Sequence, residues 1–299
     1  IDSYAQVATD TIGMMYRMIQ NADQLDKYVK LPNLKSLDVS YNANLNDISK
    51  VDTLTHLREL NMAYDYIDEL SNTNWEAFEY LRKLDVSYNF LKTIKPLEVL
   101  KDIEELNVSN NLLSGALEFN LTNSQKTLKE FDLSGNQLED ITDIMNFLDA
   151  WADGNDGNYI AREDTININL NNQTINIDVE EPIDLLVNSH TVDIELPKIF
   201  TQLKAIDVKR TTYGTESLSG RVESEGRYVT LLTDTIGDKE GIVKVQPTAG
   251  NDTCVGNGTK AIIKYKVVSN DPVVSNVEIK TDNELVNVKA GDSITFTAE

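Results

Sequence analysis

One nine-residue pattern occurs five times in this chain and limits what the chain can fold into more than any other feature. Successive copies begin 23, 24, 22 and 25 residues apart. Each carries apolar side chains at its first, fourth and sixth positions and Asn or Asp at its ninth. The copies are LKSLDVSYN (34–42), LRELNMAYD (57–65), LRKLDVSYN (81–89), IEELNVSNN (103–111) and LKEFDLSGN (128–136). No single unit of this kind can bury its apolar face alone, so neighbouring units must stack into one continuous core.

The pattern L-x-x-L-x-L-x-x-N is that of leucine-rich repeats and predicts a solenoid of short parallel strands. We expect these strands to contain Leu37, Leu60, Leu84, Leu106 and Phe131. Only 13 to 16 residues connect one motif to the next. Each return segment therefore has room for a 3₁₀ or short helical turn but not for a long helix.

The ninth motif position predicts a ladder of buried amides. An Asn side chain both donates and accepts, so it can bond the unpaired backbone groups of its own turn and of the next repeat. Asp65 takes this position in the second repeat, and an ionised carboxylate has no donor. We expect Asp65 to be protonated, bridged by water or turned to solvent, and Asp65→Asn to stabilise the protein.

Both ends of a solenoid need a cap. Near-helical spacing of apolar residues predicts an amphipathic helical cap over residues 4–29, and the stretch Asp143 to Trp151 predicts a short helix over the other end. The apolar residues of the N-terminal stretch are Ile12, Met15, Ile19, Ala22 and Leu25.

From about Thr165 the pattern changes to the alternation typical of β-strands. The alternating segments are 166–170, 174–178, 192–196, 227–232, 241–245 and 260–268. They are separated by Gly, Asn, Asp and Ser clusters, which favours an Ig-like β-sandwich. We therefore expect an α+β repeat protein with a helical cap (1–30), a solenoid (31–160), an Ig-like sandwich (161–270) and the opening strands of a further β-domain (271–299).

The charge balance excludes several classes of partner. The chain has 49 acidic and 27 basic residues and a net charge of −22, which disfavours nucleic acid and anionic lipid surfaces. No apolar stretch approaches the ~20 residues of a membrane span. The single cysteine, Cys254, cannot form an intrachain disulfide, and the two histidines are far apart in sequence. We expect a monomer with no cofactor, no metal site and no membrane insertion.

Two motif columns supply candidate ligand-binding residues on the concave face. Strand alternation sends the fifth position to that face, and the eighth position holds three tyrosines. The candidates are Asp38, Asn61, Asp85, Asn107 and Asp132, with Tyr41, Tyr64 and Tyr88. The alternatives are a solvated, hydrogen-bonded Asp and Asn ladder, and rings that merely cover the turns.

Catalytic and calcium sites are disfavoured. Asp38 and Asp85 could be spaced for glycosidase chemistry, but an open sheet neither excludes water nor raises a carboxyl pKa. The chain contains no G-x-S-x-G, P-loop or H-E-x-x-H motif, and we assign no catalytic residue. Residues 152–164 resemble a calcium loop only weakly, because Asn158 and Asp164 stand where Gly and Glu are required. A plain interdomain turn is the favoured interpretation.

The combination of these features resembles the internalins and related leucine-rich-repeat surface proteins of Gram-positive bacteria. The resemblance rests on the repeats of 22 to 25 residues, the predicted N-terminal cap, and the segments NNQTINID (171–178) and VDIELPKIF (192–200). The resemblance implies a secreted or wall-attached module that recognises a protein or glycan, host-derived in some relatives. The alternative is the accessory, non-catalytic region of a larger extracellular enzyme. Since the chain begins without Met or a basic leader, we expect it to be a mature or trimmed part of a longer protein.

Overall fold

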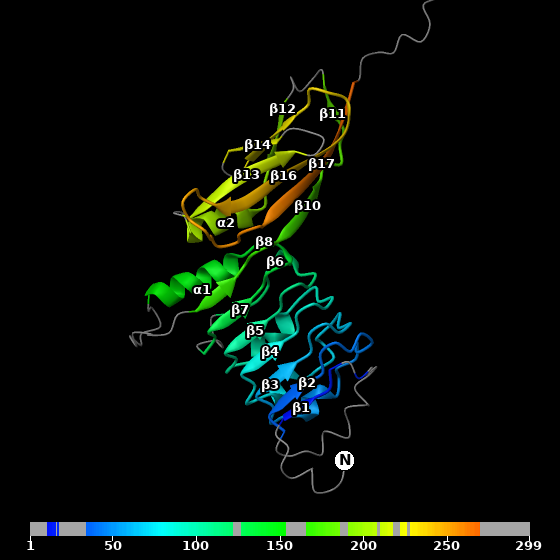
Figure 1. Cartoon of the computed structure of the whole chain (residues 1–299), viewed down its shortest axis with the longest axis vertical. Helices are drawn as coiled ribbons and strands as arrows, with labels where there is room; N and C mark the ends of the chain where they lie inside the picture. The colour runs from blue at the N-terminus through cyan, green and yellow to red at the C-terminus, as the bar shows by residue number, and fades with distance from the viewer. Residues whose placement is uncertain are drawn as a thin grey trace, which may run out of the picture.

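The computed structural model describes residues 11–15, 17, 34–121, 127–153, 166–185, 191–207, 210–217, 222–225 and 228–269. Within them the molecule is elongated, with the stacked repeats at one end and a second, β-rich part at the other (Figure 1). No helix among these residues is both long and apolar enough to cross a membrane. Residues 271–299, expected to open a further β-domain, lie outside the described part.

The five motifs form five parallel strands in register, as predicted. These are β2 (Ser36–Asp38), β3 (Glu59–Asn61), β4 (Lys83–Asp85), β5 (Glu105–Asn107) and β7 (Glu130–Asp132). The fourth motif positions pair across the sheet in the series Leu37, Leu60, Leu84, Leu106 and Phe131, and all five are buried. The returns hold the 3₁₀ helices η3 (Val51–Thr53), η4 (Trp75–Ala77) and η5 (Lys95–Val99). A small parallel pair, β6 (Ser114–Ala116) and β8 (Gln137–Asp140), lies in the last two returns.

The N-terminal edge of this sheet is closed by a strand where the sequence predicted a helix. β1 (Thr11–Gly13) pairs with β2, placing Ile12 opposite Leu37. Met14 is 5% exposed whereas Met15 is 43% exposed. Burial of the side chains therefore alternates here with the two-residue period of a strand. The open edge of β2 explains the outcome, because its backbone groups need partners, and Met14 N–H donates to the Asp38 carbonyl at 2.6 Å. The rest of the expected cap, residues 1–10, 16 and 18–30, lies outside the described residues.

The other edge of the solenoid also gains a strand. β9 (Asn167–Asn169) pairs with β7, so the segment 166–170 belongs to the solenoid sheet and not, as expected, to the sandwich. Ile168 lies opposite Phe131 and Asn169 opposite Asp132. The repeat pattern does not reveal this sixth unit, because Gln173 replaces the ladder Asn and because a longer insertion precedes the unit. That insertion contains α1 (Thr142–Asp153), a helix at the predicted place.

The β-rich part consists of two sheets and one helix. The larger sheet has the order β10 (Thr174–Asp178), β17 (Lys260–Val268), β16 (Gly237–Pro247) and β13 (Thr211–Ser217), with β11 (Ile183–Asp184) also on β17. The smaller has the order β12 (Thr191–Glu195), β15 (Tyr228–Leu232) and β14 (Val222–Glu225). Alternate residues of β17 are buried, and Tyr265 Oη donates to the Leu232 carbonyl of the smaller sheet at 3.2 Å. The sequence pattern did not predict β11, β13, β14 or α2 (Lys198–Ile206).

Asn side chains at the ninth motif position form the predicted ladder through the solenoid. The Asn111 amide donates to the Val86, Val108 and Ser109 carbonyls at 3.0, 3.1 and 3.2 Å, and its Oδ1 accepts from Leu91 N–H at 3.0 Å. Asn42, Asn89 and Asn136 donate in the same way to the preceding repeat and to their own turn. Each rung therefore joins two repeats through groups that no strand pairing satisfies.

Asp65 is the defective rung of this ladder. Its Oδ1 accepts from Asn42 N–H at 2.6 Å, but its Oδ2 is buried without a partner in the described structure. The residue is 2% exposed, so it does not turn to solvent. Desolvation, opposed by the Asn42 hydrogen bond and assisted by Asp38, raises the pKa of Asp65 to about 8. A protonated carboxyl can donate, which an ionised one cannot.

The ladder continues into the β-rich part and joins the two ends of the molecule. Gln173 Nε2 donates to the Leu133 carbonyl at 2.9 Å and Gln173 Oε1 accepts from Leu138 N–H at 3.1 Å. Gln173 N–H then donates to Thr259 Oγ1 at 3.2 Å, and Lys260 N–H donates to the Gln173 carbonyl at 2.9 Å. Gln173 and Thr259 are both fully buried. Gln173 thus closes the solenoid with its side chain and joins the next sheet through its backbone.

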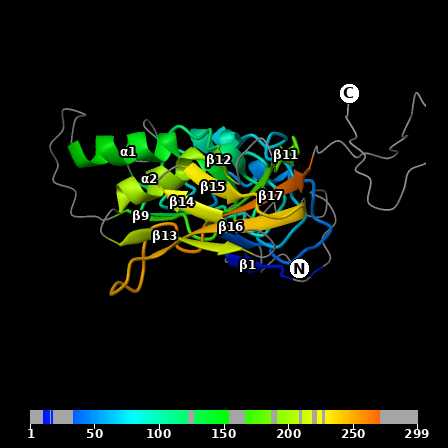
Figure 2. The ribbon, with the colours of Figure 1, turned by 90° about the horizontal axis from the view of Figure 1, so that it is seen from above.

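A second contact across the junction centres on Asp140 of β8. α2 lies beside α1 over the end of the solenoid (Figure 2). Lys198 Nζ reaches Asp140 Oδ2 at 2.8 Å, and Gln202 Nε2 donates to Asp140 Oδ1 at 2.8 Å. Although desolvation acts to raise it, hydrogen bonds from Lys198, Thr142 and Gln202 together hold the pKa of Asp140 well below its usual range.

We predict that Asp65→Asn stabilises the protein and that the gain grows with pH. The folded chain keeps a proton that the unfolded chain releases, so wild-type stability falls as pH rises from about 4 towards 8. Near pH 4 the protonated Asp65 carboxyl can donate as the amide does, so the gain there is at most about 1 kcal/mol, and the linked proton adds on the order of 2–4 kcal/mol by pH 7. Thermal melts at pH 4 and pH 8 measure both effects.

The matched control is Asn89→Asp, which places the same defect in an intact rung and should introduce the same loss of stability at high pH. An Asp65→Asn variant that melts no higher than wild type at pH 8 would show that the turn already accommodates the carboxylate.

We also predict that Asp140→Asn lowers the melting temperature at pH 7 by an amount that disappears in acid. The carboxylate is favoured in the folded state, so its contribution is present above the unfolded-state pKa and is lost as pH falls below about 4. Loss of the charged hydrogen bonds should cost about 1–3 kcal/mol at pH 7. Melts of both proteins from pH 7 to pH 3 test this, and a penalty independent of pH would contradict it.

Candidate functional site

A hollow of about 430 Å³ runs along the sheet of the solenoid. β2, β3, β4, β5 and β7 form its floor, and the side chains of the third and fifth motif positions line it. Alternation along each three-residue strand produces this arrangement, because the intervening leucine or phenylalanine points into the core. We call this surface the concave hollow.

The fifth-position column lies in the concave hollow, as predicted, and its side chains are held by the backbone. Asp85 Oδ1 accepts from Ser87 N–H at 2.9 Å, and the same bond to the residue two positions later recurs along the column. It is made by Asp38, Asn61, Asn107 and Asp132 at 2.9 to 3.1 Å. Asn107 also donates to Asp85 Oδ2 at 3.0 Å. These bonds give the column a structural role beside the proposed contact with ligand.

The third-position column, which the sequence pattern had not indicated, contributes four of the seven charged side chains that line the concave hollow. It consists of Ser36, Glu59, Lys83, Glu105 and Glu130. It could have been found by applying the same alternation one step earlier along each strand. Lys83 Nζ lies 2.6 Å from Glu105 Oε1, and this contact is the main reason that the pKa of Lys83 is raised.

The concave hollow is therefore strongly acidic. Six carboxylates line it, and Lys83, already paired with Glu105, is the single cation among the lining residues. The six are Asp38, Glu59, Asp85, Glu105, Glu130 and Asp132. A cleft lined by one sign of charge concentrates ligands of the opposite sign and speeds their association.

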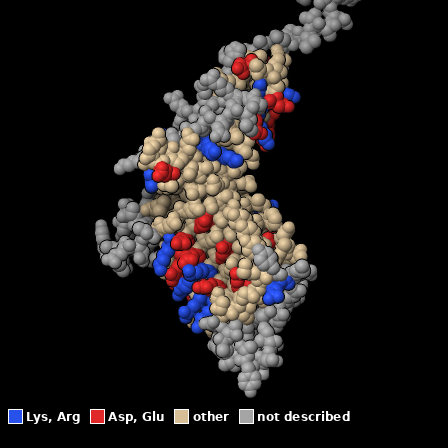
Figure 3. Space-filling model, in the orientation of Figure 1, with Lys and Arg blue, Asp and Glu red and all other residues tan. Residues whose placement is uncertain are grey.

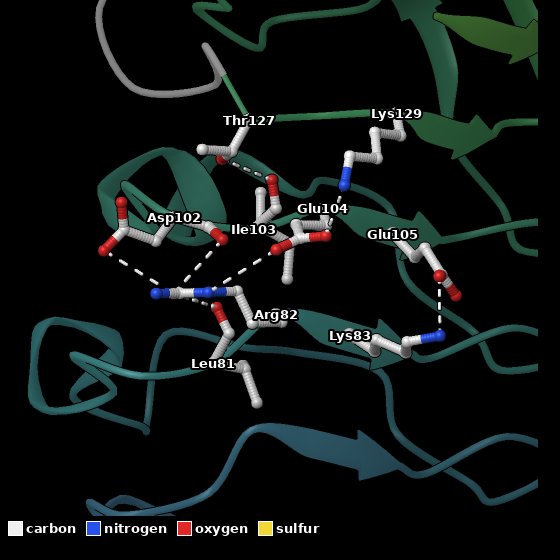
Figure 4. A network of polar contacts seen from close by, with 9 residues as sticks. All are labelled: Leu81, Arg82, Lys83, Asp102, Ile103, Glu104, Glu105, Thr127 and Lys129. Carbon is white, nitrogen blue, oxygen red and sulfur yellow. Dashed lines mark hydrogen bonds and ion pairs between the residues drawn. The ribbon is translucent and has the colours of Figure 1, made fainter. Parts of the chain in front are cut away.

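A network of ion pairs borders the hollow at the second motif position (Figure 4). Arg82 lies between Asp102 at 3.5 Å and Glu104 at 3.7 Å, and Lys129 Nζ reaches Glu104 at 2.8 Å. The hydrogen bond from Lys129 is the main reason that the pKa of Glu104 is lowered. Figure 3 shows acidic and basic side chains gathered together on one side of the solenoid.

The three tyrosines do not line the concave hollow, although the sequence placed them on the same face. They lie on the turn after each strand, with positive φ angles of 59°, 59° and 54° for Tyr41, Tyr64 and Tyr88. Their rings form a column. The centroids of Tyr41 and Tyr64 are 4.3 Å apart at 9°, and those of Tyr64 and Tyr88 are 4.0 Å apart at 10°.

A second hollow, of about 420 Å³, continues the concave surface towards the β-rich part. It shares Glu130 and Asp132 with the first hollow and is closed on the other side by Arg210 and residues 253–256. The Cys254 thiol is buried. Arg210 Nε lies 3.2 Å from Asp207 Oδ2.

No group of three or more His, Cys, Asp or Glu in the described part of the chain is arranged to hold a metal ion. The weak calcium-loop candidate falls mostly on residues 154–165, which lie outside the described residues, as does His190.

Comparison with known proteins identifies the fold. A family model described as Leucine Rich repeat matches residues 30–48 and 124–141. InlP of Listeria monocytogenes aligns with a TM-score of 0.55 at 20% identity, over 80% of this chain and 61% of InlP. The internalin-like protein lmo2027 aligns with a TM-score of 0.52 at 17% identity, over 90% of both chains. The secreted internalin-like protein Lmo2445 aligns with a TM-score of 0.55 at 14% identity, over 90% of this chain and 88% of Lmo2445. Both lmo2027 and Lmo2445 are from Listeria monocytogenes. No curated protein sequence matches significantly.

These likenesses confirm the predicted resemblance at the level of fold. The chain has an internalin-like leucine-rich-repeat fold. At identities of 14 to 20% the comparison assigns neither a ligand nor a functional residue to this chain. The chain spans about three fifths of the length of InlP, so the likeness does not assign the activity of the whole relative to this chain.

Proposed function

We propose that this chain is the recognition module of a secreted or cell-surface protein and that its concave hollow binds a Lys- and Arg-rich segment of a partner protein. The observation that carries the proposal is the acidic lining, six carboxylates against one paired lysine. The lining residues stand on short strands fixed by the amide ladder, so the charges are held before a ligand arrives. Such preorganisation favours binding because little freedom is lost on association.

The proposal extends to the rest of the chain. The likeness to a secreted internalin-like protein supports an extracellular location. In this proposal the β-rich part acts as an Ig-like adaptor that holds the solenoid away from its attachment point. The ladder bonds from Gln173 to Thr259 support a rigid connection between solenoid and adaptor.

We predict that peptides selected from a random display library on the immobilised chain are enriched in Lys and Arg. The same peptides should bind about tenfold more weakly to the triple variant Asp38→Asn, Glu59→Gln, Glu130→Gln at low salt. Each substitution removes a charge from the hollow and keeps an oxygen acceptor, so Ser40 N–H and Ser36 Oγ retain their bonds. The difference should shrink towards 1 M salt, where screening acts over about 3 Å.

A matched control removes the same charge elsewhere. Glu69, Glu76 and Glu79 are exposed and lie outside the hollow. The triple change of these residues to Gln should leave peptide affinity within about twofold of wild type, because the distant charges are screened. Selected peptides without basic residues, or equal binding to both triple variants, would count against the hollow as the site.

A further inference from the structure

The turn after each strand requires a left-handed residue, and three tyrosines occupy it against their conformational preference. The eighth motif position has φ between 53° and 68° at every turn described, including Asn110, Gly135 and the sixth unit's Asn172. Gly and Asn adopt this conformation at little cost, whereas bulky residues rarely do. The fold is satisfied by Asn or Gly at this position, so the tyrosines need another explanation. Strained residues of this kind cluster at functional sites.

Among the described residues the tyrosine column ends at Tyr88. The Tyr64 ring is stacked between the rings of Tyr41 and Tyr88, at separations of 4.3 and 4.0 Å. The next turn carries Asn110, whose Oδ1 occupies the place that a Cβ on Gly135 would take. The Asn110 side chain therefore points away from Tyr88. Among the described residues Tyr88 makes a ring contact only with Tyr64, so the ring face towards Asn110 has no aromatic partner.

A second apolar column runs beside the first at the tenth motif position. Tyr66, Phe90 and Leu112 are exposed, and the rings of Tyr66 and Phe90 lie 5.3 Å apart at 59°. The two columns form a surface that we call the aromatic ridge, made of Tyr41, Tyr64, Tyr66, Tyr88, Phe90 and Leu112. Apart from the half-buried Tyr41, its members are 37 to 53% exposed. Isolated exposed apolar residues are ordinary, but a contiguous group indicates an interaction site.

The aromatic ridge is also uncharged. From Tyr64 to Tyr66, Tyr88 to Phe90 and Asn110 to Leu112 the only ionisable acid is Asp65, which is buried. The exposed groups are rings, hydroxyls and one amide, in a chain whose net charge is −22. This surface offers no counter-charge to an acidic ligand, and the surrounding charge repels one.

We propose that the aromatic ridge binds a neutral glycan at the free face of Tyr88. A pyranose ring has one face of polarised C–H groups, which the negative face of an aromatic ring attracts. Its hydroxyls would hydrogen-bond to the Asn110 amide and to the Tyr88 hydroxyl, beside the exposed Leu112. This site is separate from the concave hollow, since none of the ridge residues lines it. Each of the two proposals can therefore be tested, and contradicted, without affecting the other.

The test is an array of neutral and of acidic glycans probed with the labelled chain and four variants. Tyr88→Asn puts a residue suited to φ 54° in place of the ring, so it should fold at least as stably as wild type yet bind neutral glycans about tenfold more weakly. Tyr88→Phe keeps the ring and should stay within about threefold. Tyr228→Asn, at an exposed tyrosine of the β-rich part, is the control and should bind like wild type.

Asn110→Tyr separates this site from a generally sticky aromatic surface. A fourth tyrosine would stack on Tyr88 and cover its free face, so glycan binding should fall although an aromatic ring has been added. The proposal is overturned if no neutral glycan binds, if acidic glycans bind preferentially, or if Tyr88→Asn binds like wild type. It is equally overturned if Asn110→Tyr strengthens binding, or if the ridge variants lose only the basic peptides of the concave hollow.

Discussion

The buried amide ladder is the interaction on which the rest of this structure depends. The strands are three residues long, and the carbonyls of the sixth motif position just after them, such as those of Val86 and Val108, accept from no backbone N–H of the described residues. Asn42, Asn89, Asn111 and Asn136 supply the missing bonds by donating to the carbonyls of two consecutive repeats. Because these groups are buried, leaving one unmatched costs about 1–3 kcal/mol. The ladder therefore fixes the spacing and curvature on which every surface column is built.

Both candidate surfaces are consequences of that ladder. To point its amide inward, each turn passes through a left-handed residue just before the ladder position, which sends the eighth side chain outwards. The strand before it presents the third and fifth positions to the concave hollow. A single backbone turn thus separates an acidic surface from an uncharged aromatic one. One short repeat therefore contributes to both of the surfaces that we propose as binding sites.

The same ladder connects the solenoid to the β-rich part. Gln173 is one methylene longer than Asn and still reaches the Leu133 carbonyl, while its backbone bonds to Thr259 and Lys260 begin the next sheet. Asp140, Lys198 and Gln202 add a polar contact on the other side of the junction. Polar contacts therefore hold the junction at two separate places.

The sequence by itself determined the repeat register, the buried leucine columns, the amide ladder, the defect at Asp65 and the fifth-position column, because each follows from a short period that local geometry enforces. It also indicated most strands of the second half. Only the tertiary structure decided what happens at the edges. Residues 11–13 became a strand because β2 needed a partner, and residues 167–169 joined the solenoid sheet because β7 did. The division of tyrosines from carboxylates likewise depended on the φ of the turn, which the motif letters do not show. Edges and turns are set by neighbours distant in sequence, and no local period records them.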